Sequence, residues 1–257
     1  MDYPDFPSTQ PVIIGALGGS GTRAGVGLLR EAGIWMGDQV NPETEDSKAM
    51  RAYLNGWFNP ILEAVTKGYG INEDAVRDLH RALSIHRENI PGADAPWGWK
   101  NPRNMWLIPF YAQVFPGFKF IHMIRDVREL ATSNNDYLLR TSGRLLLADN
   151  PTDDPRLAQI RIWTLGNKLA RHFATSILGE TNYFVIQYEE LCAEPRPVIE
   201  RLFAFLGAEL DDERLANCLS LIHPSPRLGN WLDDDPFGGV KVDSETLNVM
   251  ESFGYPV

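Results

Sequence analysis

Near the start of the sequence lies an apolar run. It leads directly into a glycine-rich turn and then into a helix pattern. Residues 11–17 (PVIIGAL) predict a short strand that is buried on both faces. Residues 15–21 contain four glycines, and residues 22–32 predict a helix that ends at Gly33. A buried strand, a tight turn and a helix in this order are typical of α/β proteins, in which helices cover a parallel sheet.

The alternation of apolar strands and helices continues along the chain. Residues 118–124 and 183–187 predict two more buried strands, and residues 97–100 predict a short one. Apolar spacing predicts helices over residues 46–66, 73–88, 104–114, 127–139, 156–178 and 197–206. We therefore predict an α/β fold in which a single domain, residues 1–257, holds one parallel β-sheet flanked by helices.

Several residues make these helix predictions more specific. Pro109 predicts a kink or early stop within residues 104–114, and Asp126 is well placed to cap the next helix. Apolar positions from Ile162 to Ile177 fall on one face, which makes the helix over residues 156–178 the most amphipathic of the set.

The composition predicts a cytoplasmic enzyme. Hydrophobic residues make up 44% of the chain, and no apolar stretch approaches the roughly 18–20 residues that span a bilayer. Residues 1–11 lack the basic region and apolar core of a secretory signal. The two cysteines, Cys192 and Cys218, have neither disulfide-framework nor zinc-site spacing, so we expect no metal.

The charge of the chain is negative but unevenly distributed. A formal net charge of −10 argues against a nucleic-acid partner or an acidic membrane surface. Residues 96–171 nevertheless hold 11 of the 24 Lys and Arg residues and only 6 Asp and Glu residues. This basic stretch suits a pocket for a small polyanion, and the alternative is a solvated helix face.

The glycine-rich turn has the chemistry of a phosphate-binding loop. Closely spaced glycines allow backbone N–H groups to surround a phosphate, and Ser20 and Thr22 add hydroxyl donors. The pattern GxxxxGK[ST] needs a Lys where Thr22 stands, and the pattern GxGxxG is also unmet, which disfavours an ATP- or GTP-dependent kinase. A tight turn with nothing bound is the alternative.

The same turn resembles the 5′-phosphosulfate loop of sulfotransferases that use 3′-phosphoadenosine 5′-phosphosulfate (PAPS), whose core is often SGT followed by Thr or Arg. Its Gly-Thr-Arg ending is similar to that of the heparan sulfate 3-O-sulfotransferases. The resemblance implies a P-loop-like architecture in which the 5′-phosphate is held by Gly18, Gly19, Ser20, Gly21, Thr22 and Arg23. Gly19 departs from the family, which usually has a catalytic Lys or Arg at that position.

Residues 115–133 resemble the 3′-phosphate site of the family, where a strand ends in Arg and a Ser follows eight residues later. Here these residues are Arg125 and Ser133. Arg offers a planar fork for a phosphate dianion, and Ser adds a neutral donor. The alternative is that Arg125 merely pairs with Asp126 or Glu129 at the surface.

Two further segments extend the resemblance toward the C-terminus. Residues 183–191 and 203–207 resemble the third strand and following helix of the family, which places Tyr188 either near the adenosine or in the core. Arg227 and Gly229 resemble the C-terminal loop that closes over the 3′-phosphate, with a surface turn as the alternative.

The resemblance also suggests residues for catalysis. Lys100 matches the Lys-x-Pro element that faces the sulfuryl group in carbohydrate sulfotransferases, with Arg23 and Arg103 as other candidate cations and a solvated strand end as the alternative. For the general base, Glu43 and Asp46 are the candidates, and both also suit the first turn of a helix. The remaining candidates are His80, His86 and His122, of which His122 lies within a predicted strand.

These features together predict a sulfotransferase that moves a sulfuryl group from PAPS, without a metal, to a hydroxyl of a small-molecule, carbohydrate or lipid acceptor. Aromatic residues are expected either to line the acceptor pocket or to form core: Trp35, Trp57, Phe58, Trp97, Trp99 and Trp106. The alternatives are a P-loop kinase that binds magnesium and ATP, and a non-catalytic relative that binds the nucleotide without turnover. The sequence leaves the oligomeric state open.

Overall fold

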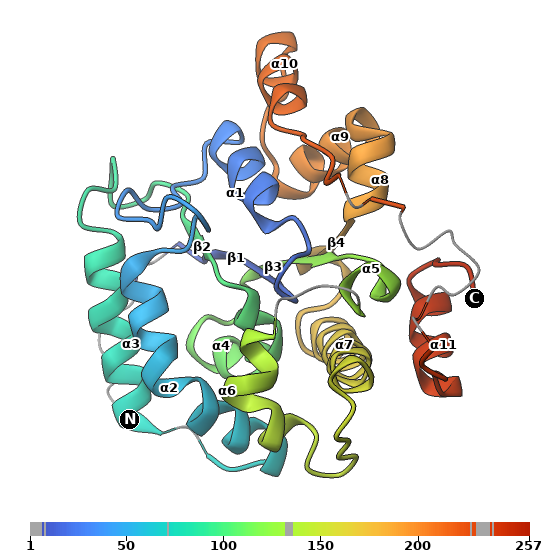
Figure 1. Ribbon diagram of the computed structural model, residues 1–257. Helices are drawn as coiled ribbons and strands as arrows, with labels where there is room; N and C mark the ends of the chain where they lie inside the picture. Colours follow the sequence, from blue (N-terminus) through green and yellow to red (C-terminus); the bar gives the residue numbers. More distant parts are fainter. Residues whose placement is uncertain are drawn as a thin grey trace.

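Four parallel strands form the central sheet of the protein (Figure 1). The structure is a computed structural model that describes residues 7, 9–70, 72–131, 136–226, 228–229, 237 and 239–257. The strands are β1 (Val12–Ala16), β2 (Gly98–Lys100), β3 (Lys119–Ile124) and β4 (Tyr183–Gln187), in the spatial order β2-β1-β3-β4. All four predicted strands are confirmed.

The carboxyl ends of the strands lie along one edge of the sheet because every neighbouring pair is parallel. In β1, Val12 lies opposite Gly98 on one side and opposite Lys119 on the other. The chain therefore adds β2 on one side of β1 and then adds β3 on the other side. A reversal of this kind opens a crevice at the carboxyl ends of the strands, and ligands bind there in open α/β sheets.

One face of the sheet is covered by α1 (Thr22–Glu31), α9 (Pro195–Leu206) and α10 (Asp212–Ser220), which lie above it in Figure 1. Ile14 of β1 and Met123 of β3 pack there against Val26 of α1 and Leu202 of α9. Neighbouring Ile13 belongs to the core on the opposite face. Strand residues alternate between the faces, so a sheet covered on both sides requires the continuous apolar run seen in β1.

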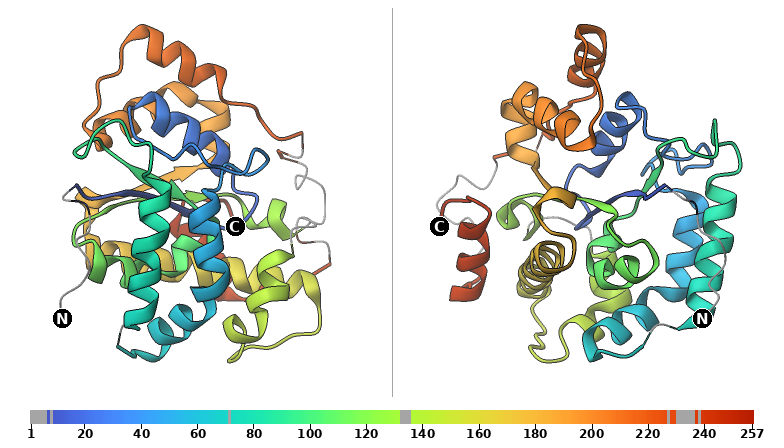
Figure 2. Two further views of the ribbon diagram at one scale, coloured as in Figure 1. Left: turned by 90° about the vertical axis from the view of Figure 1, so that its left-hand side faces the viewer. Right: turned by 180° about the vertical axis from the view of Figure 1, so that it is seen from behind.

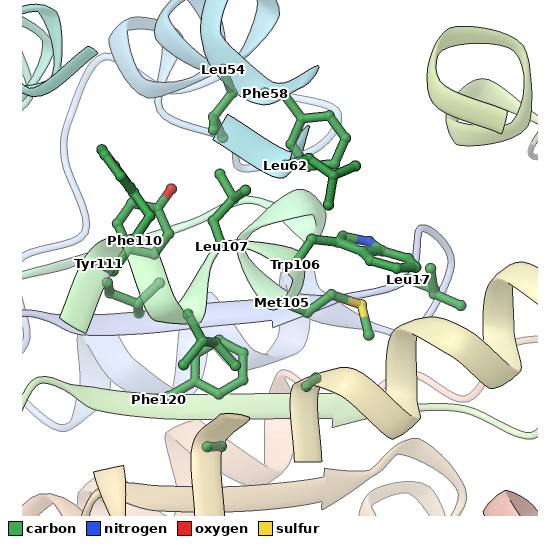
Figure 3. Close-up of a cluster of buried hydrophobic side chains, with 14 of the residues drawn as sticks. Leu17, Leu54, Phe58, Leu62, Met105, Trp106, Leu107, Phe110, Tyr111 and Phe120 are labelled. Atoms are coloured by element: carbon green, nitrogen blue, oxygen red, sulfur yellow. The ribbon is translucent and has the colours of Figure 1, made fainter. Parts of the chain in front are cut away.

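The second face is covered by a larger group of helices, drawn below the sheet in Figure 1 and from two other sides in Figure 2. These are α2 (Lys48–Lys67), α3 (Glu73–His86), α4 (Ile108–Val114), α6 (Tyr137–Leu146), α7 (Pro155–Phe173) and α11 (Ser244–Ser252). Figure 3 shows the centre of this core, where Met105 lies close to Phe120 of β3 and Phe58 of α2 lies beyond Trp106. Met105 and Trp106 belong to the 3₁₀ turn η1 (Pro102–Trp106).

The predicted cap of one helix is confirmed, and another predicted helix ends at a glycine. Asp126 Oδ1 accepts a hydrogen bond from the backbone N–H of Arg128 at 2.8 Å, so Asp126 caps α5 (Val127–Ala131). Gly207 follows α9 with φ of 71°, a left-handed conformation that glycine adopts at low cost.

Three predicted helices differ from those observed. Residues 104–114 divide into η1 and α4, and Pro109 lies in the first turn of α4, where its missing N–H costs no hydrogen bond. Residues 127–139 also divide, because α5 ends at Ala131 and α6 begins at Tyr137. In residues 156–178, α7 gives way to one turn of π-helix, η2 (Ala174–Leu178), and Ile177 is 46% exposed rather than on the buried face.

Several elements were not predicted because they are short and largely polar. They are α8 (Tyr188–Ala193), α10, α11 and the 3₁₀ turn η3 (Glu180–Asn182). Among the described residues, no helix combines the length and the apolar character needed to cross a bilayer. The assignment of residues 1–257 to one domain stays a prediction.

Candidate functional site

The segments that follow β1, β3 and β4 meet at the carboxyl edge of the sheet. β1 leads into the turn over residues 17–21, Arg125 directly follows β3, and Tyr188 directly follows β4. Arg125 Nη1 donates a hydrogen bond to the carbonyl oxygen of Gly19 at 3.1 Å. The Arg125 guanidinium also lies 4.7 Å from the centre of the Tyr188 ring. Three segments that are distant in the sequence are therefore in direct contact.

The turn depends on glycine at two positions. Gly19 and Gly21 have φ of 99° and 78°, in the left-handed region that other residues rarely adopt. A Cβ atom on Gly21 would lie 2.6 Å from Cε2 of Tyr188, closer than van der Waals contact allows. The turn is thus packed directly against the aromatic ring, and both the conformation and the space require glycine at position 21.

The start of α1 is open to an anion. Gly21 is the N-cap of α1, no side chain accepts a hydrogen bond there, and the first turn holds no acidic residue. The first N–H groups of a helix carry partial positive charge, and without a protein cap they favour a bound anion. Ser20, adjacent to this N-cap, is buried.

A buried carboxylate joins Arg125 to Gly229. Arg125 forms an ion pair with Glu129, and the side chains of the two residues are 11% and 2% exposed. Glu129 Oε1 also accepts a hydrogen bond from the backbone N–H of Gly229 at 2.6 Å. The pairing of Arg125 with Glu129 considered from the sequence therefore forms, but away from the surface, and it includes Gly229.

The hydroxyl of Tyr188 connects the site to the segment after α10. It accepts a hydrogen bond from the backbone N–H of Ser225 at 2.9 Å and donates to the carbonyl oxygen of His223 at 3.3 Å. Burial raises the pKa of Tyr188, so the hydroxyl stays protonated near neutral pH. The ring is left to contact Gly21 and Arg125.

A second cluster lies at the end of β2, where Lys100 and Asp46 form a buried ion pair. Lys100 Nζ lies 2.7 Å from Asp46 Oδ1 and also donates a hydrogen bond to the carbonyl oxygen of Thr44. Lys100 is only 3% exposed. Burial lowers the pKa of Lys100 from its ordinary value, and the neighbouring Asp46 carboxylate opposes that shift.

The loop that carries Asp46 is held in a constrained conformation. The backbone N–H of Asn41 donates to the carbonyl oxygen of Asp46 at 2.8 Å, and that of Glu45 donates back to Asn41 at 2.8 Å. Glu45 has φ of 61°, the one positive value among the described residues other than glycine. Such a conformation costs of order 1–3 kcal/mol and persists where the surrounding contacts impose it. Asp46 is therefore placed by its loop as well as by Lys100.

Arg103 is a buried cation whose described hydrogen bonds all go to neutral acceptors. Its guanidinium donates to the carbonyl oxygen of Leu54 at 3.1 Å and to Asn55 Oδ1 at 3.0 Å. Its Nε donates to Asn101 Oδ1 at 3.3 Å. These bonds join η1 to α2.

A cavity of about 250 Å³ extends from the glycine turn toward α2, α6 and α7. Its apolar wall includes Leu17, Trp106, Leu130, Leu138, Leu139, Ile162 and Trp163. Gly18 borders the cavity on the turn side, and Asp46, Arg51 and Arg103 contribute charged groups. Figure 3 shows the Trp106 indole beside Leu17. The cavity thus borders both Gly18 of the glycine turn and Asp46, the ion-pair partner of Lys100.

The chain matches the model of a family described as "Sulfotransferase family" over residues 25–212, well over half of its length. The chain belongs to the sulfotransferase family. The matched residues include the segments of Lys100, Arg125 and Tyr188, whereas the glycine turn lies just before them.

Solved sulfotransferase structures share the fold of this sulfotransferase. The sulfotransferase domain from the curacin biosynthetic pathway superposes with a TM-score of 0.61 at 15% identity, covering 98% of this chain and 100% of that one. The sulfotransferase domain of the Synechococcus PCC 7002 olefin synthase gives 0.57 at 17% identity, covering 100% and 98%. Sulfotransferase STF9 from Mycobacterium avium gives 0.57 at 16% identity, covering 98% and 79%. Among curated protein sequences, none matches the chain.

These comparisons confirm the predicted family and the α/β, P-loop-like fold with a helix-flanked parallel sheet. They mark this sulfotransferase as a transferase and favour neither the kinase nor the non-catalytic alternative. The residue assignments made from the sequence stay predictions, now with known positions in the structure.

The predicted nucleotide-site residues of the sulfotransferase gather at one place, as far as the structure describes them. Gly19, Gly21, Arg125 and Tyr188 are in contact, and Glu129 joins Gly229 to them. Thr22 begins α1, and Gly18 borders the cavity. Ser133 and Arg227 lie outside the described residues.

The predicted catalytic residues of the sulfotransferase separate into three groups, which are the Lys100–Asp46 pair, Arg23 with Glu43, and Arg103. Lys100 and Asp46 form one buried pair, so Lys100 is not the solvated strand end considered as its alternative. Asp46 is not the helix cap either, because Ser47 Oγ accepts the capping hydrogen bond of α2. Arg23 and Glu43 are both exposed, and Arg23 Nη1 donates to the carbonyl oxygen of Glu43 at 3.3 Å.

The histidines and tryptophans of the sulfotransferase mostly have packing roles. His122 is fully buried between Tyr183 and Asn167, at 2.9 Å from each, and burial lowers its pKa to about 4. His86 is buried against Ser47 and the carbonyl oxygen of Gly98. Trp97 and Trp99 are fully buried and stack at 5.7 Å, whereas Trp106 also lines the cavity.

Sequence reasoning missed part of the cavity wall. Arg51, Tyr137, Gln159 and Trp163 line the cavity but belong to no motif. The one related feature in the sequence was the amphipathic face of residues 156–178, which includes Ile162. That pattern does not show that the first part of α7 borders the cavity.

Proposed function

We propose that this sulfotransferase transfers a sulfuryl group from PAPS to a hydroxyl of a small-molecule, carbohydrate or lipid acceptor bound in the cavity beside Gly18. The observation that carries this proposal is the contact of Gly19, Gly21, Arg125 and Tyr188 at the carboxyl edge of β1 and β3. This is the crevice where the strand order reverses.

The groups at this edge fit a nucleotide with phosphates at two positions. The open start of α1 and the turn over residues 18–22, with Arg23, would hold the 5′-phosphate. The Arg125 guanidinium and the Gly229 N–H already converge on one carboxylate, so they suit a second anion, the 3′-phosphate. The family resemblance adds Ser133 and Arg227 to this second site.

The Lys100–Asp46 pair suits the transfer step. When bound, PAPS supplies a sulfuryl group whose S–O bond to the nucleotide breaks while the acceptor oxygen forms the new S–O bond. Asp46 lines the cavity and receives the proton that the acceptor hydroxyl loses. Lys100 supplies the positive charge that the family usually places at Gly19. Among the base candidates, exposed Glu43 is disfavoured because it does not border the cavity.

Nucleotide binding tests this function. We expect 3′-phosphoadenosine 5′-phosphate (PAP) to bind without metal and more tightly than adenosine 5′-phosphate or magnesium ATP. Arg125→Ala should weaken PAP binding by roughly 30-fold, equivalent to about 2 kcal/mol for a charged hydrogen-bond partner, and adenosine 5′-phosphate binding by less than about threefold. Isothermal titration calorimetry measures both affinities.

The comparison between the two nucleotides is made within each variant, because Arg125→Ala removes the ion-pair partner of buried Glu129 and lowers the stability of the fold. Arg144→Ala is the matched control, since it removes an exposed positive charge from the same basic stretch. Equal losses for the two nucleotides in Arg125→Ala would refute the 3′-phosphate assignment. Tighter binding of magnesium ATP than of PAP would refute the proposed donor.

The predictions of a cytoplasmic location and of a reaction without metal or nucleic acid rest on the sequence alone. The proposal needs no metal, because Lys100 and the arginines at the site supply positive charge.

A further inference from the structure

The described cavity wall carries more arginine side chains than carboxylates. Asp46 is the carboxylate that borders the cavity, and it is bound to Lys100. Arg51 of α2 and Arg103 of η1 also border the cavity, and no ion pair between described residues includes either of them. The wall therefore carries two guanidinium groups that form no ion pair with a described carboxylate.

Burial of the Arg103 charge is unfavourable for the free energy of the fold. The residue is 8% exposed, and burial lowers its pKa. The nearby Asp46 carboxylate opposes that shift, and the Arg51 charge adds to it. Three of its N–H groups donate to Leu54, Asn55 and Asn101, and a guanidinium has five. A buried charge without a counterion is unfavourable, so an anion at this wall would stabilise it.

Arg103 and Lys100 contact different parts of the protein. Arg103 contacts α2 and lies 5.9 Å from the centre of the Tyr137 ring of α6. Lys100 instead contacts Thr44 and Asp46 and has Arg23 of α1 among its charged neighbours. Asp46 is an electrostatic neighbour of both cations.

The rest of the cavity wall is mostly apolar. Trp106, Trp163 and Ile162 contribute large apolar surfaces, as do the leucines of α6. A ligand that fills the cavity therefore buries an apolar segment and presents an anion to the arginines.

We propose that the acceptor carries an anionic group, a carboxylate or phosphate, which binds Arg51 and Arg103 and is joined by an apolar segment to the hydroxyl that receives the sulfuryl group. This inference rests on the proposed function and specifies its acceptor. In this orientation the hydroxyl lies at the Asp46 end of the cavity, where its proton is accepted.

The probe pair for this inference is 8-hydroxyoctanoate and 1,8-octanediol, which share an apolar chain and a hydroxyl and differ in the carboxylate. In the presence of PAP, we expect the wild-type protein to bind the acid at least about tenfold more tightly than the diol, measured by calorimetry. With PAPS as the donor, kcat/KM should also be higher for the acid than for the diol, even though the diol offers two hydroxyls for transfer.

Variants test whether the arginines cause the preference. Arg51→Gln changes an exposed residue, so the fold should be retained, and the preference should fall to less than about threefold. Lys48→Gln is the matched control, because it removes an exposed charge of the same helix that does not border the cavity. Arg103→Gln should also lose the preference for the acid. A rise in its Tm on addition of PAP checks that this variant is folded and binds the nucleotide.

The outcomes separate this inference from the proposed function. If PAP stabilises the protein but the acid and the diol bind equally, the anionic acceptor is refuted and the PAPS assignment survives. If Lys48→Gln and Arg51→Gln reduce the preference equally, general charge rather than the arginine wall explains it, and the inference is again refuted. Failure of PAP to bind would refute the proposed donor while leaving the acid preference measurable.

Discussion

At the scale of single residues, Lys100 is buried against Asp46, and Asp46 borders the cavity. We predict that Lys100→Met lowers kcat by about 100-fold or more, as the loss of a transition-state charge contact does, while PAP affinity changes by less than about threefold. Steady-state kinetics and calorimetry measure the two quantities. Unchanged turnover would remove Lys100 from catalysis.

The double variant Lys100→Met with Asp46→Asn is the control for folding, since the single change leaves the Asp46 carboxylate without its partner. The pH profile adds a second readout. Burial lowers the pKa of Lys100, so the protonated form is lost as the pH rises through a value below the ordinary 10.5. As the pH rises, turnover should therefore begin to fall at a lower pH than it would if Lys100 were solvated.

Glu129 binds the same two groups that we assign to the 3′-phosphate, Arg125 and the Gly229 N–H. We predict that Glu129→Gln tightens PAP binding by about fivefold, because the neutral amide neither repels the phosphate dianion nor pairs strongly with Arg125. Adenosine 5′-phosphate binding should not change. Weaker PAP binding would instead show that Glu129 orients Arg125 for the nucleotide.

At the scale of elements, the unit formed by β1, the glycine turn and α1 depends on its contact with Tyr188 of α8. Gly33→Ala and Gly21→Ala are a matched pair, because both glycines have positive φ but only the Cβ at position 21 meets the ring. We predict a loss of unfolding free energy of about 1–2 kcal/mol for Gly33→Ala and a larger loss for Gly21→Ala. Equal losses in urea unfolding would contradict a tight turn-to-ring contact.

The strands could be predicted because the sheet is covered on both faces, so β1 is a continuous apolar run and β3 and β4 are mostly apolar. Helix ends were harder, since apolar spacing continues across a break. Residues 127–139 have helical spacing throughout, yet Asp136 is the N-cap of a second helix. The π-turn after Phe173 adds a residue to the helical repeat, so spacing alone misplaced Ile177.

At the scale of the whole molecule, the sequence predicted which residues of the proposed nucleotide site come together better than it predicted the wall of the cavity. Parallel strands have their carboxyl ends at one edge, so motifs directly after β1, β3 and β4 meet whatever the length of the chain between them. The cavity depends instead on how α2, α6 and α7 pack, and Arg51 and Trp163 have no local pattern that reveals it. The pairing of Asp46 with Lys100 likewise arises from tertiary packing.

The Lys100–Asp46 contact has a consequence for the order of events in the proposed reaction. While Asp46 is ionised, the ammonium of Lys100 is attracted to it and is less available to any other oxygen. A proton gained by Asp46 cancels that attraction, and the ammonium then interacts more strongly with whichever nearby oxygen becomes negative. Deprotonation of the acceptor and stabilisation of the leaving group are in this way coupled through one pair of side chains, so neither advances far without the other.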